Sequence, residues 1–159
     1  MRFITVNDCD TINTLKGVAV SLWVSGCPHK CEGCFNPETW EYTSGSKFDE
    51  NAFDKLLACV GSKYVNTFSI LGGEPFAPGN IDTVLSIINT VRQNYPNKTI
   101  MVWTGYKIED IIKNYNLSSI DYVIDGKFEL DNPTKKKLRG SDNQRMIKIY
   151  GNNSFEIID

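Results

Sequence analysis

Three cysteines crowd into one short stretch, Cys27-Pro28-His29-Lys30-Cys31-Glu32-Gly33-Cys34, with the spacing C-x3-C-x2-C. Three sulfur atoms this close in sequence can all turn toward one metal centre, and thiolates prefer zinc, copper(I) or iron–sulfur clusters. A structural zinc ion and a four-iron cluster both usually take four protein ligands. The three cysteines therefore predict a metal centre that either recruits a fourth ligand from elsewhere or keeps one position open for a substrate.

The missing fourth ligand separates two interpretations. A structural zinc site would need His29, Cys9 or Cys59 to complete it. No fourth partner stands at zinc-like spacing, so the pattern favours an iron–sulfur cluster. Cys59 falls inside a helical pattern and is expected to pack as a small apolar residue. His29 is either a hydrogen-bond donor beside the cluster or an exposed side chain.

The bulk properties of the chain describe an ordinary globular protein. It has 159 residues, of which 41% are hydrophobic, and we expect a single domain over residues 1–159. A net charge of -2 gives no reason to expect a nucleic-acid or membrane surface. The N-terminus lacks the pattern of a secretion signal, and five cysteines fit a reducing compartment better than a disulfide framework. We therefore expect a cytoplasmic protein.

Apolar runs predict strands, and apolar periodicity predicts helices between them. The strands are expected at residues 17–24, 67–71, 99–103, 120–124, 145–150 and 154–158. A first helix should be capped by Asp49 and continue to Val60. A second should be capped by Asn80 and end near Pro96, and a shorter third should occupy residues 108–115.

Strands that alternate with helices imply a parallel sheet with helical cover. A closed eight-unit barrel needs about 200 residues or more, so the sequence predicts an α/β fold, an open partial (β/α) barrel with mostly parallel strands. Ligands of such folds sit beyond the carboxyl ends of the strands. The cysteine loop and residues 72–75, 104–106 and 125–127 are therefore expected to converge on one rim.

The second motif is Gly72-Gly73-Glu74-Pro75, which directly follows a predicted strand. Two glycines allow the backbone to approach a ligand closely, and Glu74 places a carboxylate at the rim. Taken alone, the tetrapeptide could be an ordinary strand-to-helix turn. Its combination with the cysteine spacing is much rarer than either part, and it is therefore the more informative signal.

The combination resembles the radical S-adenosylmethionine (SAM) superfamily, and within it the activating enzymes of glycyl-radical proteins. Residues 34–40 are similar to the segment that follows the cysteines in those activases. The likeness to activases of anaerobic ribonucleotide reductases continues through residues 71–80, 121–128 and 138–145. Small departures are Leu71 and Lys127, where that group often has serine and proline. Neither touches the expected ligands.

The resemblance implies a cofactor arrangement. Cys27, Cys31 and Cys34 would bind three irons of a 4Fe-4S cluster, and SAM would chelate the fourth. The residues implied in SAM binding are Gly33, Cys34 and Phe35 around the adenosyl part, Gly72, Gly73 and Glu74 near the methionyl end, and also Asn36. No further catalytic side chain is assigned.

The implied activity is that of an oxidoreductase. Reductive cleavage of SAM to methionine and a 5′-deoxyadenosyl radical would generate a glycyl radical on an anaerobic (class III) ribonucleotide reductase. The implied partners are this reductase, an electron donor such as reduced flavodoxin, and a second copy of the chain in a homodimer, with neither nucleic acid nor a membrane. The alternatives are an activase of another glycyl-radical enzyme and a non-enzymatic zinc-binding module.

Overall fold

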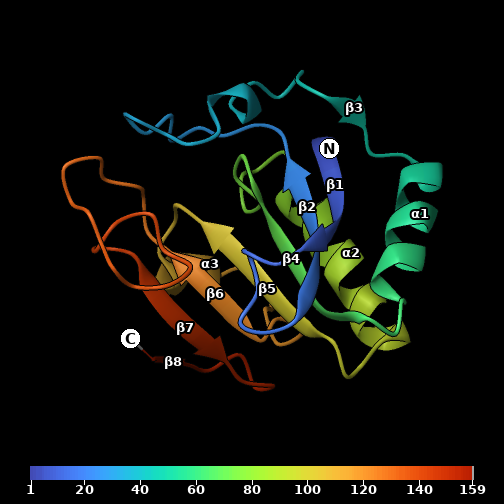
Figure 1. Ribbon diagram of the computed structural model, residues 1–159. Helices are drawn as coiled ribbons and strands as arrows, with labels where there is room; N and C mark the ends of the chain where they lie inside the picture. Colours follow the sequence, from blue (N-terminus) through green and yellow to red (C-terminus); the bar gives the residue numbers. More distant parts are fainter. Residues whose placement is uncertain (159) are drawn as a thin grey trace.

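The chain forms eight strands and three α-helices in the computed structural model, which describes residues 1–158 (Figure 1). The strands are β1 (Arg2–Asp10), β2 (Val18–Val24), β3 (Ser46–Lys47), β4 (Val65–Gly72), β5 (Thr99–Thr104), β6 (Tyr122–Asp125), β7 (Arg145–Ile149) and β8 (Phe155–Ile157). The helices are α1 (Glu50–Val60), α2 (Ile81–Asn94) and α3 (Ile108–Ile111), with a short 3-10 helix at Pro37–Thr39. Among the described residues, no helix is both long and apolar enough to cross a bilayer.

All eight strands belong to one mixed sheet, in the order β3-β1-β2-β4-β5-β6-β7-β8. Only the three central pairs, β2–β4, β4–β5 and β5–β6, are parallel. The four outer pairs, β1–β2, β1–β3, β6–β7 and β7–β8, are antiparallel. The predicted open partial (β/α) barrel with mostly parallel strands is therefore wrong.

The connections explain this difference. A parallel pair needs a crossover, and α1, α2 and α3 each lie on one of the three crossovers between β2, β4, β5 and β6. Outside that region the chain turns back without a helix, through residues 11–17 before β2 and through residues 126–144 after β6. Strand–helix alternation thus describes only the middle of the chain, and the two ends add antiparallel strands.

Most elements lie within a few residues of their predicted positions, but β1 and β3 were not predicted. The third helix is also shorter than expected, since it ends at Ile111 and gives way to turns. Asn114 and Asn116 follow there, and asparagine side chains favour turns over helix interiors. The Asn116 side chain indeed accepts a hydrogen bond from the Ser118 amide at 2.9 Å.

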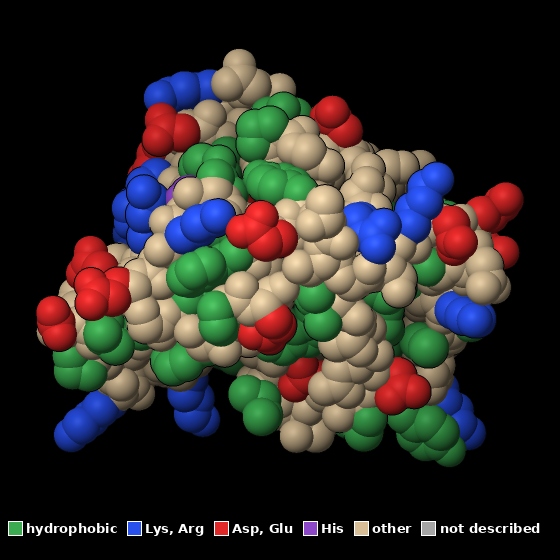
Figure 2. Space-filling view, turned by 90° about the horizontal axis from the view of Figure 1, so that it is seen from above, with side chains coloured by type: hydrophobic (Ala, Val, Ile, Leu, Met, Phe, Trp, Pro, Cys, Tyr) green, Lys and Arg blue, Asp and Glu red, His purple; other side chains and the backbone are tan. Residues whose placement is uncertain are grey.

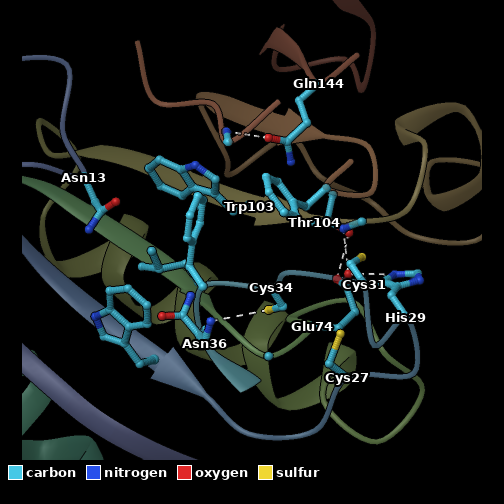
Figure 3. A pocket seen from close by; sticks show the side chains of 18 of the residues that line it. Asn13, Cys27, His29, Cys31, Cys34, Asn36, Glu74, Trp103, Thr104 and Gln144 are labelled. Atoms are coloured by element: carbon cyan, nitrogen blue, oxygen red, sulfur yellow. Dashed lines mark hydrogen bonds and ion pairs between the residues drawn. The ribbon is translucent and has the colours of Figure 1, made fainter. Parts of the chain in front are cut away.

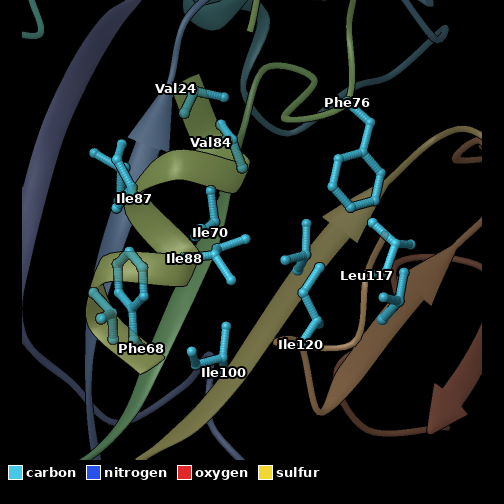
Figure 4. Close-up of a cluster of buried hydrophobic side chains, with 14 of the residues drawn as sticks. Val24, Phe68, Ile70, Phe76, Val84, Ile87, Ile88, Ile100, Leu117 and Ile120 are labelled. Carbon is cyan, nitrogen blue, oxygen red and sulfur yellow. The ribbon is translucent and has the colours of Figure 1, made fainter. Parts of the chain in front are cut away.

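The main core lies between the helices and one face of the sheet. Side chains at alternate positions of β2 and β4, such as Val24 and Ile70, are fully buried there beside Val84 and Ile88 of α2 (Figure 4). The intervening positions face the other side of the sheet, where Ser21 and other polar residues are also buried. The helix-free face is therefore partly polar, and it contributes to the site described next.

Candidate metal and cofactor site

The three cysteines of the loop after β2 line one wall of a single cavity. Cys27, Cys31 and Cys34 are half-buried, and none of them forms a disulfide. Their side chains lie near Glu74 and His29, whereas Asn13 lies at the opposite side of the cavity (Figure 3). The cavity measures about 560 Å³, within the range of small-molecule sites.

Backbone hydrogen bonds fix the cysteine loop at its base. The Gly26 amide donates to the Thr39 carbonyl at 2.7 Å, and the Cys27 amide donates to the Trp40 carbonyl at 2.9 Å. Farther along, the Asn36 amide donates to the Cys34 sulfur at 3.4 Å. This bond helps to hold the Cys34 side chain in its place in the cavity wall.

The Gly72-Gly73 turn lies directly against that loop. The Gly73 amide donates to the Val24 carbonyl at 2.7 Å, and the Glu74 amide donates to the Gly26 carbonyl at 2.8 Å. A Cβ atom on Gly73 would stand 2.6 Å from the Gly26 carbonyl oxygen, so only glycine fits this approach. The two motifs, about 40 residues apart in sequence, are thus joined backbone to backbone.

The four loops predicted to converge do converge. The cavity is lined by Gly72, Gly73 and Glu74, by Thr104 and Gly105, and by Gly126, Lys127 and Phe128, together with the cysteine loop. The prediction is correct because β2, β4, β5 and β6 are parallel to one another and so end at the same edge of the sheet.

The predicted site residues are not all placed alike. Phe35 and Asn36 line the cavity with the cysteines and the glycine turn, but Gly33 is not among the lining residues. Gly33 is exposed and has a positive φ of 69°, and a Cβ there would meet the Leu130 side chain at 2.6 Å. Of the other two cysteines, Cys9 is exposed and Cys59 lines a separate groove beside α1.

The far end of the cavity contains residues that sequence reasoning missed. Asn13, from the loop after β1, lies there (Figure 3), and Asn7 and Asp10 of β1, Trp23 and Trp103 also line the cavity. A cluster of polar residues with no apolar periodicity, as at residues 7–13, was their only signal. Its relevance depends on β1 pairing with β2, which the sequence did not reveal.

Asp10 is held at that end by a dense set of hydrogen bonds. It accepts from the Ser21 hydroxyl at 2.5 Å, from the Asn13 side chain at 2.7 Å and from the Ile12 amide at 2.8 Å. Burial raises the pKa of the Asp10 carboxyl, but these donors outweigh burial and the net pKa lies below its ordinary value of 3.8. Asp10 is therefore a charged anchor for the β1–β2 loop.

Residues 138–145, which the resemblance singled out, shape the wall opposite the cysteine loop. The Gln144 side chain accepts from the Gly140 amide and donates to the Gly126 carbonyl, at 2.7 and 2.8 Å. Trp103 donates from its indole nitrogen to the Leu138 carbonyl at 2.8 Å. These hydrogen bonds therefore fix the last part of the return loop, residues 126–144, beside the cavity.

The mouth of the cavity is apolar at some points and mixed in charge around them. Phe35 is 73% exposed, and its ring lies 5.0 Å from that of Phe128. The surface seen from the loop side carries acidic, basic and hydrophobic side chains interspersed, without one dominant sign of charge (Figure 2). This side therefore shows no broad patch of one sign of charge.

The donor set suits a thiolate-bound group. Burial raises the pKa of the Cys27 thiol, so this thiol is protonated at neutral pH until a metal displaces the proton. In the described part of the chain, no three His, Cys, Asp or Glu side chains are grouped in a way that could hold a metal ion. The three soft thiols instead share the wall of a cavity large enough for a cluster and a small ligand.

Comparison with known proteins identifies the class. Residues 15–147 match a family described as a 4Fe-4S single cluster domain, which supports an iron–sulfur cluster. Proteins named anaerobic ribonucleoside-triphosphate reductase-activating protein are similar to this chain along most of their length. The one from Enterobacteria phage T4 is 40% identical over 146 residues, which are 92% of this chain and 93% of the relative.

Bacterial proteins with the same name are also similar to this chain. That of Haemophilus influenzae is 34% identical over 91% of this chain and 96% of its own length. That of Escherichia coli K12 is 34% identical over 80% and 86%. No solved structure matches the chain significantly. The chain belongs to the family of anaerobic ribonucleoside-triphosphate reductase-activating proteins.

Proposed function

We propose that this chain is a radical SAM enzyme that activates an anaerobic (class III) ribonucleotide reductase. The observation that carries the proposal is that three free thiols and the Gly72-Gly73 turn line one cavity. The names of the relatives supply the partner. The protein's part in such a reaction is to bind, to orient and to exclude water, because the cofactor carries out the difficult chemistry.

Cys27, Cys31 and Cys34 are the proposed ligands of a 4Fe-4S cluster. Three thiolates would leave one iron free for the amino and carboxylate groups of SAM. When bound and reduced, the cluster would supply one electron for the cleavage of SAM to methionine and a 5′-deoxyadenosyl radical, and this radical would take a hydrogen atom from the glycine Cα of the reductase to give 5′-deoxyadenosine and the glycyl radical. Structural zinc is less well supported. It needs four ligands at about 2.3 Å around one ion, and the described residues contain no group of three His, Cys, Asp or Glu side chains that could hold such an ion.

The proposed SAM contacts fall on two loops that touch each other. Gly72 and Gly73 can present bare backbone to the methionyl end, since neither carries a side chain. Gly33, Cys34, Phe35 and Asn36 are the proposed neighbours of the adenosyl part, and the exposed Phe35 ring offers it an aromatic face. Glu74 is proposed to lie close to the methionyl end.

The remainder of the cavity is proposed to admit the glycine segment of the partner. Away from the cysteine motif, the cavity is also lined by Asn7, Asn13, Trp23 and Trp103, which combine amide groups with broad apolar walls. Such walls exclude water from a reactive species once the segment is seated. We further propose that the chain forms one domain, assembles as a homodimer in the cytoplasm, and receives its electron from a donor such as reduced flavodoxin.

The test is anaerobic iron and sulfide quantification followed by SAM cleavage with dithionite. We expect close to four irons per chain, formation of 5′-deoxyadenosine, and a glycyl doublet in electron paramagnetic resonance when the reductase is added. Cys31→Ala should lose the cluster and SAM cleavage. Cys59→Ala is the matched control, because Cys59 lies outside the cavity, and it should retain both.

Three results would each contradict a part of this proposal. About one zinc per colourless chain after anaerobic purification would support a non-enzymatic zinc module. A wild-type rate of SAM cleavage in Cys31→Ala would show that the ligand assignment is wrong. A glycyl doublet on a different glycyl-radical enzyme, and none on the reductase, would keep the chemistry and change the partner.

A further inference from the structure

The carboxylate of Glu74 is occupied by the protein itself. Glu74 is 1% exposed, and its Oε1 accepts from the Phe76 amide at 2.9 Å and the Thr104 hydroxyl at 2.7 Å. Its Oε2 accepts from the Gly105 amide at 2.7 Å and from His29 Nε2 at 3.0 Å. An ionised carboxylate offers about four acceptor sites, so none remains for an ammonium group of a ligand.

The ring of His29 is enclosed where it meets that carboxylate. The His29 side chain is 7% exposed, and the Tyr106 ring packs edge-on against it with 4.5 Å between centroids. A Cβ atom on Gly105 would stand 2.4 Å from the His29 ring, so glycine is required there. A carboxylate only accepts, which places the proton of the imidazole on Nε2.

His29 therefore connects three loops at one point. It lies between Cys27 and Cys31 in the sequence, and its contacts reach Glu74 after β4 and Gly105 after β5. Figure 3 shows the dashed contacts of Glu74 running to His29 and to the Thr104 region beside the cysteines. The backbone bonds to Thr39 and Trp40 hold the base of the loop, whereas the buried His29 side chain connects its middle to the loops after β4 and β5.

We propose that Glu74 and His29 are positioning residues: Glu74, acting through His29, fixes the cysteine loop against strands β4 and β5, and it does not itself bind SAM. The inference rests on the proposed function for the identity of the bound group. It assigns Glu74 to retention of the cluster and leaves SAM recognition at this turn to the backbone of Gly72 and Gly73.

Two substitutions of one residue test the contact. His29→Gln keeps a side-chain N–H at about the position of Nε2, whereas His29→Asn is one methylene too short to reach Glu74. In the metal-free protein, we expect amide hydrogen exchange over residues 27–35 to be about 3- to 10-fold faster in His29→Asn and near wild type in His29→Gln. Lys30→Gln, which removes only an exposed ion pair with Glu41, is the matched control and should behave as wild type.

The reconstituted protein gives the second readout. Cluster loss to a chelator should be about 10-fold faster in His29→Asn and in Glu74→Gln. The Gln side chain at position 74 replaces one acceptor oxygen with an amide, which faces donors. In the fraction of Glu74→Gln that retains its cluster, the dissociation constant for SAM should stay within about 3-fold of wild type, because no lost contact is to SAM.

Either of two results would overturn the proposal. In the first, Glu74→Gln keeps the cluster as long as wild type does while its SAM dissociation constant rises about 10-fold or more, which would show that Glu74 contacts SAM directly. Alternatively, His29→Gln loses the cluster as fast as His29→Asn, which would show that the hydrogen bond is not what matters. Wild-type protein that takes up no cluster would instead contradict the proposed function, so the two failures are distinguishable.

Discussion

Arg145 on β7 and Asp125 on β6 face each other across an antiparallel strand pair and form two hydrogen bonds, at 2.9 and 2.5 Å. Asp125 is fully buried, and the Arg145 guanidinium also contacts Glu109 at 2.9 and 2.7 Å. Hydrogen bonds with Asp125, and then with Glu109, raise the pKa of Arg145 further above its ordinary value. The pair closes the end of β6 next to Gly126, where the long return loop begins.

Removing Arg145 should leave a buried carboxylate without its main partner. We expect Arg145→Ala to lower the free energy of unfolding by about 3 kcal/mol, the lower end for a broken buried pair. The lower end applies because Asp125 keeps the Ile108 amide at 2.9 Å and Lys107 at 3.7 Å. Urea unfolding measures the change. Lys113→Ala, which breaks an exposed pair with Asp110, should cost no more than about 0.5 kcal/mol.

Asp49 and Asn80 both stand at the N-cap position of a helix, but only Asp49 makes a capping hydrogen bond with its side chain. Asp49 caps α1 as predicted, since its side chain accepts from the Ala52 amide at 2.9 Å. Asn80 precedes α2 but makes no side-chain cap bond, and its Nδ2 donates to the carbonyls of Ser25 and Glu74 at 2.9 and 3.0 Å. Asn80 thus occupies the predicted N-cap position of α2, but its side chain does not cap the helix and instead links the two motif loops.

Exchanging asparagine and aspartate should therefore have a large effect on stability at position 80 and a small one at position 49. Asn80→Asp replaces a donor with an acceptor facing two carbonyls and should destabilise the protein by about 2 kcal/mol or more. Asp49→Asn keeps an acceptor at a true cap and should change stability by less than about 0.5 kcal/mol. Equal small effects in thermal unfolding would contradict the assigned contacts of Asn80.

Asp10 should make stability depend on pH in the acid range. Its folded-state pKa lies below the ordinary value of 3.8, because hydrogen bonds outweigh burial. A carboxyl with a lowered pKa stabilises the fold above its unfolded pKa, and this stability is lost as the pH falls through the folded pKa. The difference in unfolding free energy between wild type and Asp10→Asn should therefore be constant from about pH 7 to 5 and shrink below about pH 4.

Urea titrations at several pH values measure that difference, and other carboxyl groups cancel because both proteins contain them. A gap that widens as the pH falls would show that the Asp10 pKa is raised by folding. A gap that stays constant down to about pH 2.5 would show that Asp10 is not the titrating group.

Gly73 should tolerate no side chain, although its backbone conformation is not left-handed. Its added Cβ would stand 2.6 Å from the Gly26 carbonyl oxygen and 3.0 Å from two other Gly26 backbone atoms. We expect Gly73→Ala to lower stability by about 1–3 kcal/mol by forcing the two loops apart. Gly151→Ala is the control, since nothing lies within 4 Å of its added Cβ, and calorimetry should find less than about 0.5 kcal/mol.

Local patterns predicted the elements of this chain better than their assembly. Asp49 marked the start of α1 correctly, and the rings of Phe48 and Phe53 pack against each other at this end of the helix, 6.3 Å apart. β1 was missed because, of residues 2–10, only Asp10 is buried, so the segment shows no run of buried apolar residues. The polar residues that β1 brings to the cavity were missed with it.

The contacts of His29 and Arg145 could not be predicted for a related reason. Each joins a residue to others at least 20 positions away: His29 to Glu74, and Arg145 to Asp125 and Glu109. A single histidine or arginine carries no local sign of its partner. Only the order of strands and the course of the loops bring such pairs within hydrogen-bonding distance.

The sequence alone determined which chemical groups are present: three closely spaced thiols, a glycine pair after a strand, and the periodicity of the central strands and helices. The tertiary structure alone decided that the outer strands run antiparallel, that β1 contributes to the cavity, and that protein donors occupy the Glu74 carboxylate. The physical reason is that side-chain chemistry and local periodicity are properties of neighbouring residues. Strand direction and hydrogen-bond saturation depend on distant segments packing together.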